Sequence, residues 1–293
     1  MSAMRPRPLD PEHDLARLAA LLGHTRANGG IWHPGGIQWG LRELSNPDFE
    51  AHVWPLDDEL VAFVMSDETF VIAEANDRGP ARLELLEWAE QRLRRLGQTS
   101  IETSVVNVDP LREQLGERGF VEFDAVNELI ADIDSEIDAE ATPAPLPPGF
   151  VFGSLLDVSD DAYIELHRAA WSDRRPSPYR REVHDAVKQM PQFRADLVTI
   201  AIAPDGTPAA YCIGWLDERS ATLEIEPLGT NRSFRRLGLA LAVVHEVTRR
   251  AWLNGARWVL VWNHRSTNEA AYGLYTSAGM KPRRHIVDMR KSL

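Results

Sequence analysis

The order of predicted helices and strands occurs twice along this chain. In each half, the spacing of apolar residues predicts helix, helix, three strands, helix, strand, helix, strand. The helix that ends at Gly97 corresponds to the one that ends at Gly255, and Gly119-Phe120 corresponds to Gly279-Met280. Only the second half shows a clear further strand, over 150–156, ahead of this series. The chain is therefore expected to contain two copies of one α/β unit.

The boundary between the copies is predicted at residues 134–148. This stretch is acidic at first and then reads Ala-Thr-Pro-Ala-Pro-Leu-Pro-Pro, a composition typical of a semi-rigid linker. It separates a first domain, 1–133, from a second, 149–293. A length of 293 residues with 44% hydrophobic residues supplies enough core for two domains.

Charge and composition exclude several classes of function. The net charge of −12 argues against nucleic acid as a partner and favours a cationic substrate such as an amine, or simply solubility. No apolar run approaches the roughly 20 residues that span a membrane, and no signal peptide precedes the first helix, so a cytoplasmic protein is expected. The single cysteine, Cys212, lies in an apolar run and is expected to be buried; it allows neither a disulfide nor a thiolate metal cluster, and we expect no metal.

The stretch 223–242 has the layout of a phosphate-binding turn. An alternating strand leads into a short basic turn with Gly238, and a helix is predicted from Leu237 to Leu253. Backbone N–H groups at a helix start are unpaired, and the helix dipole adds positive charge there. Gly238 allows a ligand close to the backbone, and Arg232, Arg235 and Arg236 add positive charge. The Lys of nucleotide-binding P-loops is missing, so a nucleotide-phosphate site is the weaker interpretation.

Two motifs in the second half resemble the GNAT superfamily of N-acyltransferases. The first is Arg235-Arg236-Leu237-Gly238-Leu239-Ala240, which looks like the family's Arg/Gln-x-x-Gly-x-Gly/Ala loop. The second is the segment from Asn268 through Leu274-Tyr275 to Gly279-Met280, with Met280 in place of the usual Phe. Two such units in one chain resemble the tandem arrangement of mycothiol synthase and its relatives. The resemblance implies an α/β (α+β) fold of two tandem domains, each a mixed, mostly antiparallel central sheet flanked by helices.

The resemblance also implies a reaction. Family members use acetyl-CoA as co-substrate and transfer its acetyl group to an amine by direct attack on the thioester. We therefore expect an N-acetyltransferase for a small-molecule amine, with the second half as the catalytic domain. The alternative is a catalytically silent module that binds or senses CoA. The acceptor's identity, the acyl chain length and the oligomeric state stay open.

The cofactor-binding residues are carried over from the two motifs and the strand ahead of them. By resemblance, residues 227–230 diverge from the next strand and pair with the pantetheine arm, and the N–H of Leu228 polarises the thioester carbonyl; alternatively, Pro227 only kinks the strand. Tyr275 is implied as the general acid that protonates the departing thiolate, or it packs in the core. Asn268 is implied as a contact of the CoA arm, or it only caps its helix; the two roles are compatible. The full set is Leu228, Gly229, Thr230, Arg235, Arg236, Leu237, Gly238, Leu239, Ala240, Asn268 and Tyr275.

Two glutamates are candidates for the general base. Strand alternation places Glu224 and Glu226 on one face, and Glu224 stands at the spacing from Arg235 where some family members have a catalytic glutamate. Two neighbouring carboxylates can raise the pKa of one of them toward neutrality. They can equally form a solvated face, because many family members use water relays instead.

Further candidates lie on the acceptor side. The early helices of the second half carry His167 and His184, with Trp171, Arg174 and Tyr179 nearby; each of these is individually more typical of a structural or surface position. The first half has its own cluster, which either forms an aromatic cage or packs in the core: Trp32, His33, Trp39 and Trp54.

The first half departs from the family pattern where the chemistry would occur. Its strand-to-helix junction, 74–81, lacks the Arg/Gln-x-x-Gly-x-Gly motif and contains Pro80, which has no N–H to donate. Leu115 stands where the second half has Tyr275, and Val108 stands opposite Asn268. We therefore expect the first half to be a degenerate, non-catalytic copy.

Overall fold

The computed structural model describes residues 5–44, 46, 49–134, 145–173, 176–264 and 266–293. The chain forms two compact units: the first contains residues 1–34, 43–128 and 283–293, and the second contains 35–42 and 129–282. These units differ from the two halves of the sequence at three segments, because 35–42 and 129–133 belong to the second unit and 283–293 to the first. Residues 135–144 of the expected linker, and Arg174, lie outside the described residues.

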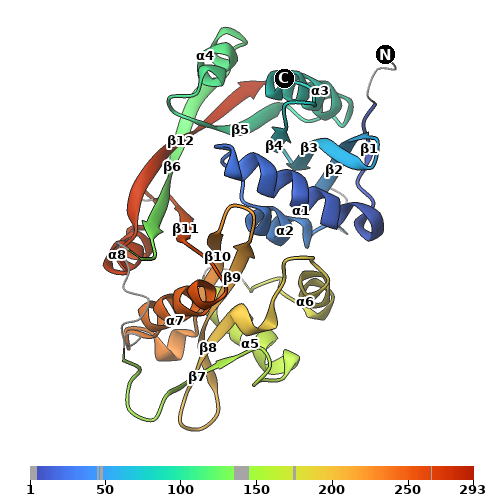
Figure 1. The fold of residues 1–293 in the computed structure, drawn as a ribbon. Helices are drawn as coiled ribbons and strands as arrows, with labels where there is room; N and C mark the ends of the chain where they lie inside the picture. The colour runs from blue at the N-terminus through green and yellow to red at the C-terminus, as the bar shows by residue number, and fades with distance from the viewer. Residues whose placement is uncertain (1–4, 45, 47–48, 135–144, 174–175, 265) are drawn as a thin grey trace. The chain divides into compact units, whose positions relative to one another are not determined.

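The first unit is built on a sheet with the strand order β1-β2-β3-β4-β5-β12-β6 (Figure 1). Adjacent strands β1 to β4 are antiparallel, β4 and β5 are parallel, and β5 and β12 are antiparallel. Its elements are β1 (Arg7–Pro8), α1 (Pro11–Ala27), β2 (Phe49–Leu56), β3 (Glu59–Asp67), β4 (Phe70–Ala75), α3 (Arg82–Arg95), β5 (Ser100–Val106), α4 (Pro110–Glu117), β6 (Val121–Asp132) and β12 (Lys281–Ser292).

The second unit is built on strands in the order β6-β11-β10-β9-β8-β7, to which β6 contributes its end. The pairs β7–β8, β8–β9 and β9–β10 are antiparallel, and β10–β11 is parallel. Its other elements are α2 (Pro34–Leu41), β7 (Val151–Ser154), α5 (Asp160–Trp171), α6 (Arg181–Lys188), η1 (Ala195–Leu197), β8 (Val198–Ile202), β9 (Pro208–Asp217), β10 (Thr222–Thr230), η2 (Arg232–Phe234), α7 (Leu239–Leu253), β11 (Trp258–Asn263) and α8 (Glu269–Ser277). Both units confirm the predicted fold class.

Two boundaries differ from the prediction for local reasons. The helix expected from Leu237 begins at Leu239, because Gly238 adopts a left-handed conformation with φ of 79° and serves as the N-cap. The first half does have a strand ahead of its first helix, β1, which pairs with β2. Sequence patterning misses it because two residues, one of them a proline, show no alternation.

Each unit has its own apolar core. In the second unit, α7 places Val243, Val247 and Ala251 on one side, where they pack in a fully buried cluster with residues of β9, β10 and β11. Cys212 belongs to this cluster, as expected, and burial raises the pKa of its thiol. In the first unit, Leu86 and Leu93 of α3 pack on the sheet in the same way. The amphipathic periodicity of α3 and α7 therefore identifies the helix face that each unit buries.

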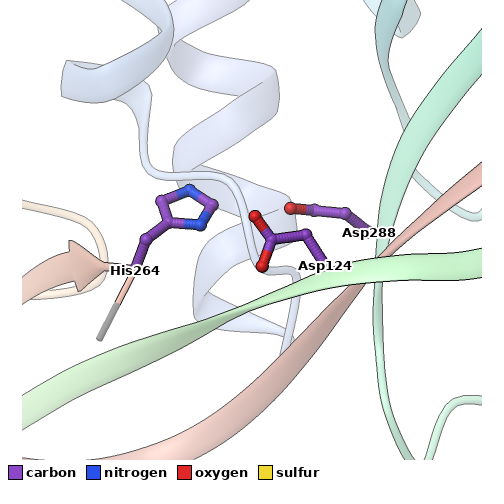
Figure 2. Close-up of side chains that lie close together, drawn as sticks. All are labelled: Asp124, His264 and Asp288. Atoms are coloured by element: carbon purple, nitrogen blue, oxygen red, sulfur yellow. The ribbon is translucent and has the colours of Figure 1, made fainter. Parts of the chain in front are cut away.

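The strands that close the first unit carry acidic side chains. Asp124 lies on β6 and Asp288 on the neighbouring β12, and their carboxyl groups point toward one another in Figure 2. Asp288 is buried and accepts a hydrogen bond of 2.5 Å from the hydroxyl of Ser104 on β5. The third residue labelled there, His264, belongs to the second unit. Among the described residues, no helix combines the length and the apolar character needed to cross a membrane.

Candidate functional site

The candidate site begins where β10 leaves β11. The parallel register of the two strands covers Thr222–Glu224 against Trp258–Leu260, whereas β10 stays paired with β9 as far as Thr230. Asn231 donates its N–H to Ala209 of β9. Because successive residues of a strand point their backbone groups to opposite sides, the N–H groups of Leu228 and Thr230 face away from β9. They are directed to the side on which β11 has diverged, as the sequence comparison implied. We call residues 225–230 and 261–263 the β10–β11 divergence.

The turn that follows β10 is shaped by left-handed residues. Asn231 caps η2 by accepting the N–H of Ser233, and the turn then passes Arg236 at φ of 63° and Gly238 at φ of 79°. Positive φ at a non-glycine residue is uncommon and costs free energy, so its presence in this turn is worth a functional explanation. The first intrahelical bond runs from the N–H of Ala242 to the carbonyl of Gly238. The N–H groups of the preceding residues therefore stand unpaired at an exposed helix start, which suits an anion.

The three arginines of this turn have different surroundings. Arg235 forms an ion pair of 2.7 Å with Asp173 and donates to the carbonyls of Ala170 and Thr230. Arg232 donates to the carbonyl of Ser172, 2.7 Å away. These contacts join the turn to the end of α5. Arg236 is exposed and forms no hydrogen bond or ion pair with any part of the chain that the structure describes, so its charge is directed to solvent.

Glu226 has the most perturbed carboxyl of the site. Its side chain is half-buried, and desolvation raises its pKa from 4.5 to about 7, with a further contribution from the nearby Glu224 carboxylate. The positive charge of Arg42 acts in the opposite direction. Its backbone carbonyl accepts a hydrogen bond of 2.6 Å from the indole of the buried Trp215. Glu226 is therefore held in place at the start of the divergence and can exchange a proton near neutral pH.

Glu224 has a different partner. Its carboxylate oxygen Oε2 accepts the N–H of Gly36, in the first turn of α2, at 2.5 Å, and its side chain is only 6% exposed. A negative charge at the N-terminus of a helix is favourable. The two glutamates thus share a strand but differ in role: one is engaged by a helix start, and the other is desolvated.

Tyr275 of α8 lies in the core cluster of the second unit and is 7% exposed. Burial raises the pKa of its phenol, and the charges of Glu226 and Cys212 raise it further. The phenol therefore stays protonated over the physiological range, and it interacts electrostatically with the carboxyl group of Glu226. A phenol that stays protonated is available in the site as a hydrogen-bond donor.

Two asparagines stand at the far side of the divergence. Asn268 caps α8, since its side chain accepts the N–H of Ala271 at 3.2 Å. Asn263 ends β11 and donates to the carbonyl of Asn268 at 3.4 Å. Its side-chain oxygen is buried and has no hydrogen-bond partner among the described residues. Asn263 could not be selected from the sequence, because an asparagine at the end of a strand is a common feature of turns.

Aromatic side chains of α2, of α5 and of the segment before α6 pack together in the second unit. His167 of α5 stacks on Tyr179 with ring centroids 3.8 Å apart, and Trp39 of α2 lies 6.1 Å from Tyr179. Burial lowers the pKa of His167 to about 3, with smaller contributions from Arg42 and His184, so the ring is neutral. Both of its nitrogens are buried without a hydrogen-bond partner in the described chain.

Other histidine and aromatic residues that were selected from the sequence form hydrogen bonds or ring contacts within their unit. His184 is hydrogen-bonded to Asp160 and Tyr179 at 3.1 Å each, and Trp171 donates to the hydroxyl of Tyr211 at 2.8 Å. In the first unit, Trp54 packs edge-on against Trp88 in the core. Trp39 belongs to the second unit, although it lies in the first half of the sequence.

The structure therefore brings together most of the residues selected from the sequence. Leu228, Gly229 and Thr230 lie on the diverging part of β10, the Arg235–Ala240 turn follows them, and Glu226 and Tyr275 act on each other electrostatically. Sequence reasoning missed the contribution of α2, namely Gly36 and Arg42. The only available signal was the Gly35-Gly36 pair, which looks like an ordinary turn.

Comparison with known proteins gives a family match within the second half of the chain and similar folds among solved structures. Residues 161–280 match the model of the acetyltransferase (GNAT) family. A GCN5-related N-acetyltransferase from Sphaerobacter thermophilus is 19% identical, with 100% of this chain and 96% of that chain covered and a TM-score of 0.58. A tandem GNAT protein from the clavulanic acid biosynthesis pathway is 15% identical, with 99% and 98% covered and a TM-score of 0.63. A GNAT-family acetyltransferase from Colwellia psychrerythraea is 14% identical, with 98% and 99% covered and a TM-score of 0.60. No curated protein matches the sequence. At these identities the similarity to the solved structures concerns the fold.

Proposed function

Because residues 161–280 match the model of the acetyltransferase (GNAT) family, we propose that the second unit transfers an acetyl group from acetyl-CoA to a primary amine of a small molecule. The observation that carries the proposal is the Glu226 carboxyl, whose pKa of about 7 is set by burial at the start of the β10–β11 divergence. A carboxylate with such a pKa is suited to remove a proton from an ammonium group at neutral pH. We place this reaction in the cytoplasm and expect neither nucleic acid nor metal to take part.

The proposed acetyl-CoA site follows from the backbone. The unpaired N–H groups at the start of α7, with Arg236 beside them, would receive the diphosphate. The N–H groups of Leu228 and Thr230 point into the divergence, where the amides of the pantetheine arm would extend the β-pairing. Arg235 supports the turn from behind through Asp173. The cofactor thereby brings the thioester carbonyl to Leu228.

In the proposed reaction, two side chains, Glu226 and Tyr275, transfer protons. Glu226 takes a proton from the acceptor ammonium, and the free amine forms a bond to the thioester carbonyl carbon. The N–H of Leu228 stabilises the negative charge that develops on the carbonyl oxygen. The carbon–sulfur bond then breaks, and Tyr275 gives its proton to the leaving thiolate. Its raised pKa, caused by burial, keeps that proton available until the sulfur carries charge. The acetylated nitrogen loses its second proton, which restores the phenol of Tyr275, and Glu226 releases the first proton to solvent.

We favour Glu226 over Glu224 as the base because of their partners. Glu224 already accepts a backbone N–H at 2.5 Å and is buried beneath α2. Glu226 is half-buried, desolvated and electrostatically coupled to Tyr275. Base and acid are then adjacent groups of one site.

The test is thiol release from acetyl-CoA in the presence of a panel of primary amines. The panel should contain polyamines, amino sugars, amino acids and a dipeptide. Acetylation is expected for at least one of them, with thiol and acetylamide formed in equal amounts by colorimetry and mass spectrometry. The alternative, a silent CoA-binding module, wins if calorimetry shows that acetyl-CoA binds while every amine leaves the thiol acylated.

A further inference from the structure

Helix α2 is made in the first half of the sequence but packs in the second unit. Two side-chain contacts hold it there besides the bond from Gly36. The amide of Gln38 donates to Gln192 at 2.8 Å, and the N–H of Gln192 returns a bond to Gln38 at 3.1 Å. Residues 35–42 therefore complete the second unit on the side where Glu224 and Glu226 lie.

The contact between Gly36 and Glu224 is close and directional. Glu224 is the last residue of β10 that pairs with both neighbouring strands, Trp215 on one side and Leu260 on the other. Its backbone is thus fixed at the point of divergence. A Cβ added to Gly36 would lie 2.8 Å from Oε2 and 3.0 Å from Oε1 of this carboxylate. A larger residue at position 36 would therefore require the Glu224 carboxylate to move away from the helix.

The helix carries two further side chains toward the acceptor side. The indole of Trp39 lies 6.0 Å from His167 and 6.1 Å from Tyr179, centroid to centroid. The guanidinium of Arg42 lies 4.1 Å from the centroid of Trp39, and its charge lowers the pKa of Glu226. Any shift of α2 would therefore change both the shape and the charge next to the proposed base.

We propose that α2 is the acceptor-recognition helix of the second unit, and that Glu224 is the positioning residue that holds it in place. The role in acceptor recognition rests on the proposed function, because the acceptor is the amine substrate proposed there. The contact between α2 and Glu224 is independent of any activity. Residues 35–42 thus have a role that their place in the sequence conceals. The contact also explains why a buried carboxylate stands next to the base without serving as one.

Hydrogen exchange tests the contact without substrate. Glu224→Ala should accelerate exchange of the amides of 36–41 by roughly tenfold or more, because a hydrogen bond to a charged group is lost. Glu224→Gln, which keeps an acceptor oxygen and the side-chain volume, should accelerate it less. Gly36→Ala should act like Glu224→Ala, whereas Gly116→Ala, in a helix with open space around the new methyl group, should change nothing in 36–41. Unchanged exchange in Glu224→Ala would overturn the proposal.

Kinetics test the assignment of roles, with the best amine of the panel as probe. Glu224→Ala should raise KM for this amine about tenfold and leave KM for acetyl-CoA unchanged. Glu224→Gln should move the acidic limb of the pH–rate profile to lower pH, because Glu226 loses a like-charged neighbour. The other groups that interact electrostatically with Glu226 stay in place: Arg42, Tyr211, Cys212 and Tyr275.

Two outcomes separate this inference from the proposed function. If Glu224→Gln lowers kcat more than 100-fold, with KM for the amine unchanged and the acidic limb gone, Glu224 is the base and the proposal fails. If no amine is acetylated but exchange in 36–41 responds as described, the proposed function fails while the contact stands, and α2 then has no acceptor to recognise. Thermal unfolding of each variant shows whether it is folded before either measurement is interpreted.

Discussion

In each unit two parallel strands pair over a short stretch and then diverge, but different groups lie at the two divergences. In the first unit the parallel register of β4 and β5 covers only Phe70–Val71 against Glu102–Thr103, and β4 continues to Ala75 beside β3. This is the geometry of β10 and β11. In the second unit the diverging strand leads into a turn with two left-handed residues and an exposed helix start. In the first unit it leads through Pro80 to Ala81, an N-cap in extended conformation.

An arginine spans the divergence of the first unit. The guanidinium of Arg82, the first residue of α3, donates to the carbonyl of Ala73 on β4 at 3.2 Å and to that of Ser104 on β5 at 3.4 Å. Asp109 lies 3.7 Å from the same group. In the first unit, a side chain therefore bonds backbone carbonyls of both diverging strands.

Each divergence also has a buried carboxyl. Burial raises the pKa of Glu74 at the end of β4, as it does for Glu226, while Arg82 counteracts the rise. Glu74, however, has no counterpart of Tyr275, since Leu115 occupies that position and is fully buried. The two units therefore share a splayed pair of strands and a desolvated acid. In the part of the chain that the structure describes, the first unit lacks three features of the proposed site: an unfilled divergence, an anion-binding turn and a proton donor.

Replacing Glu226 and Glu74 by glutamine should give the largest difference in activity between the two units. Glu226→Gln should lower kcat/KM for the amine by about 10²–10⁴, because an amide cannot accept the ammonium proton. Glu74→Gln, the matched change in the first unit, should leave activity within about twofold. Steady-state thiol release measures both. Equal losses in the two variants would show that the units cooperate in the chemistry, and the comparison would break.

Removing the phenol tests the proton donor. Tyr275→Phe should lower kcat by about 10–100-fold while acetyl-CoA binds as before, because only the proton transferred to the leaving sulfur is lost. Tyr272→Phe on the same helix serves as the control and should retain full activity. Calorimetric titration with acetyl-CoA and single-turnover kinetics distinguish weaker binding from slower chemistry. A loss confined to acetyl-CoA affinity would return Tyr275 to the role of core packing.

The raised pKa of Glu226 should also make the folded protein less stable at high pH. The pKa of Glu226 is 4.5 in an unfolded chain and about 7 in the folded one, so the folded state binds the proton more tightly. The stability that this group contributes is fully present below about pH 4.5 and is lost as the pH rises through about 7. Glu226→Gln should therefore gain about 1–3 kcal/mol over the wild type between these limits and hold that gain above them.

Denaturant unfolding between pH 4.5 and pH 8 measures this gain as the difference between variant and wild type. Glu74→Gln should show a gain of the same sign, because burial raises that pKa too. The pair would then share an effect on stability and differ in their effect on activity. A difference that stays flat or falls with pH contradicts the assigned shift of Glu226.

Two left-handed glycines with equal surroundings test the turn. Gly238 has φ of 79° and Gly97, at the end of α3, has φ of 80°, and a Cβ on either meets no atom within 4 Å. Alanine at either position should cost about 1 kcal/mol of stability from backbone strain. Only Gly238→Ala should also raise KM for acetyl-CoA, by about tenfold, since the N–H groups of the turn move. An equal KM in both variants would mean that the turn does not bind the diphosphate.

The smallest effect is expected from removing the Arg82 guanidinium, which spans the diverging strands β4 and β5 of the first unit. Arg82→Met should lower the free energy of unfolding by about 1 kcal/mol, because two backbone carbonyls lose a charged donor. Arg78→Met, which removes an exposed ion pair with Glu59, should cost less. Acetyl-CoA should bind with a stoichiometry of one in both variants, because the first unit lacks the turn. A second binding event in Arg82→Met would show that the arginine alone keeps the first unit from binding.

Local chemistry explains why much of the fold and site was predictable. The period of apolar residues in α3 and α7 reports the buried face directly, and the Arg235–Ala240 turn is a local motif whose conformation Gly238 determines. Contacts between distant segments were not predictable. The bond between Gly36 and Glu224 joins residues 188 apart, and no local pattern encodes it. The preference for Glu226 over Glu224 depends on that bond, so the sequence left the two open.

The last strand of the chain has a consequence for how the protein is made. Residues Ile286–Ser292 of β12 pair with Val106–Ser100 of β5, and residues 283–293 belong to the first unit. A ribosome that has released the first 128 residues has therefore produced a sheet with an uncovered edge at β5. Such an edge pairs readily with other chains, and its own partner strand is synthesised after every other element. The first unit is thus completed only after the second unit has been synthesised, and shortening the chain before Arg283 would leave the β5 edge uncovered.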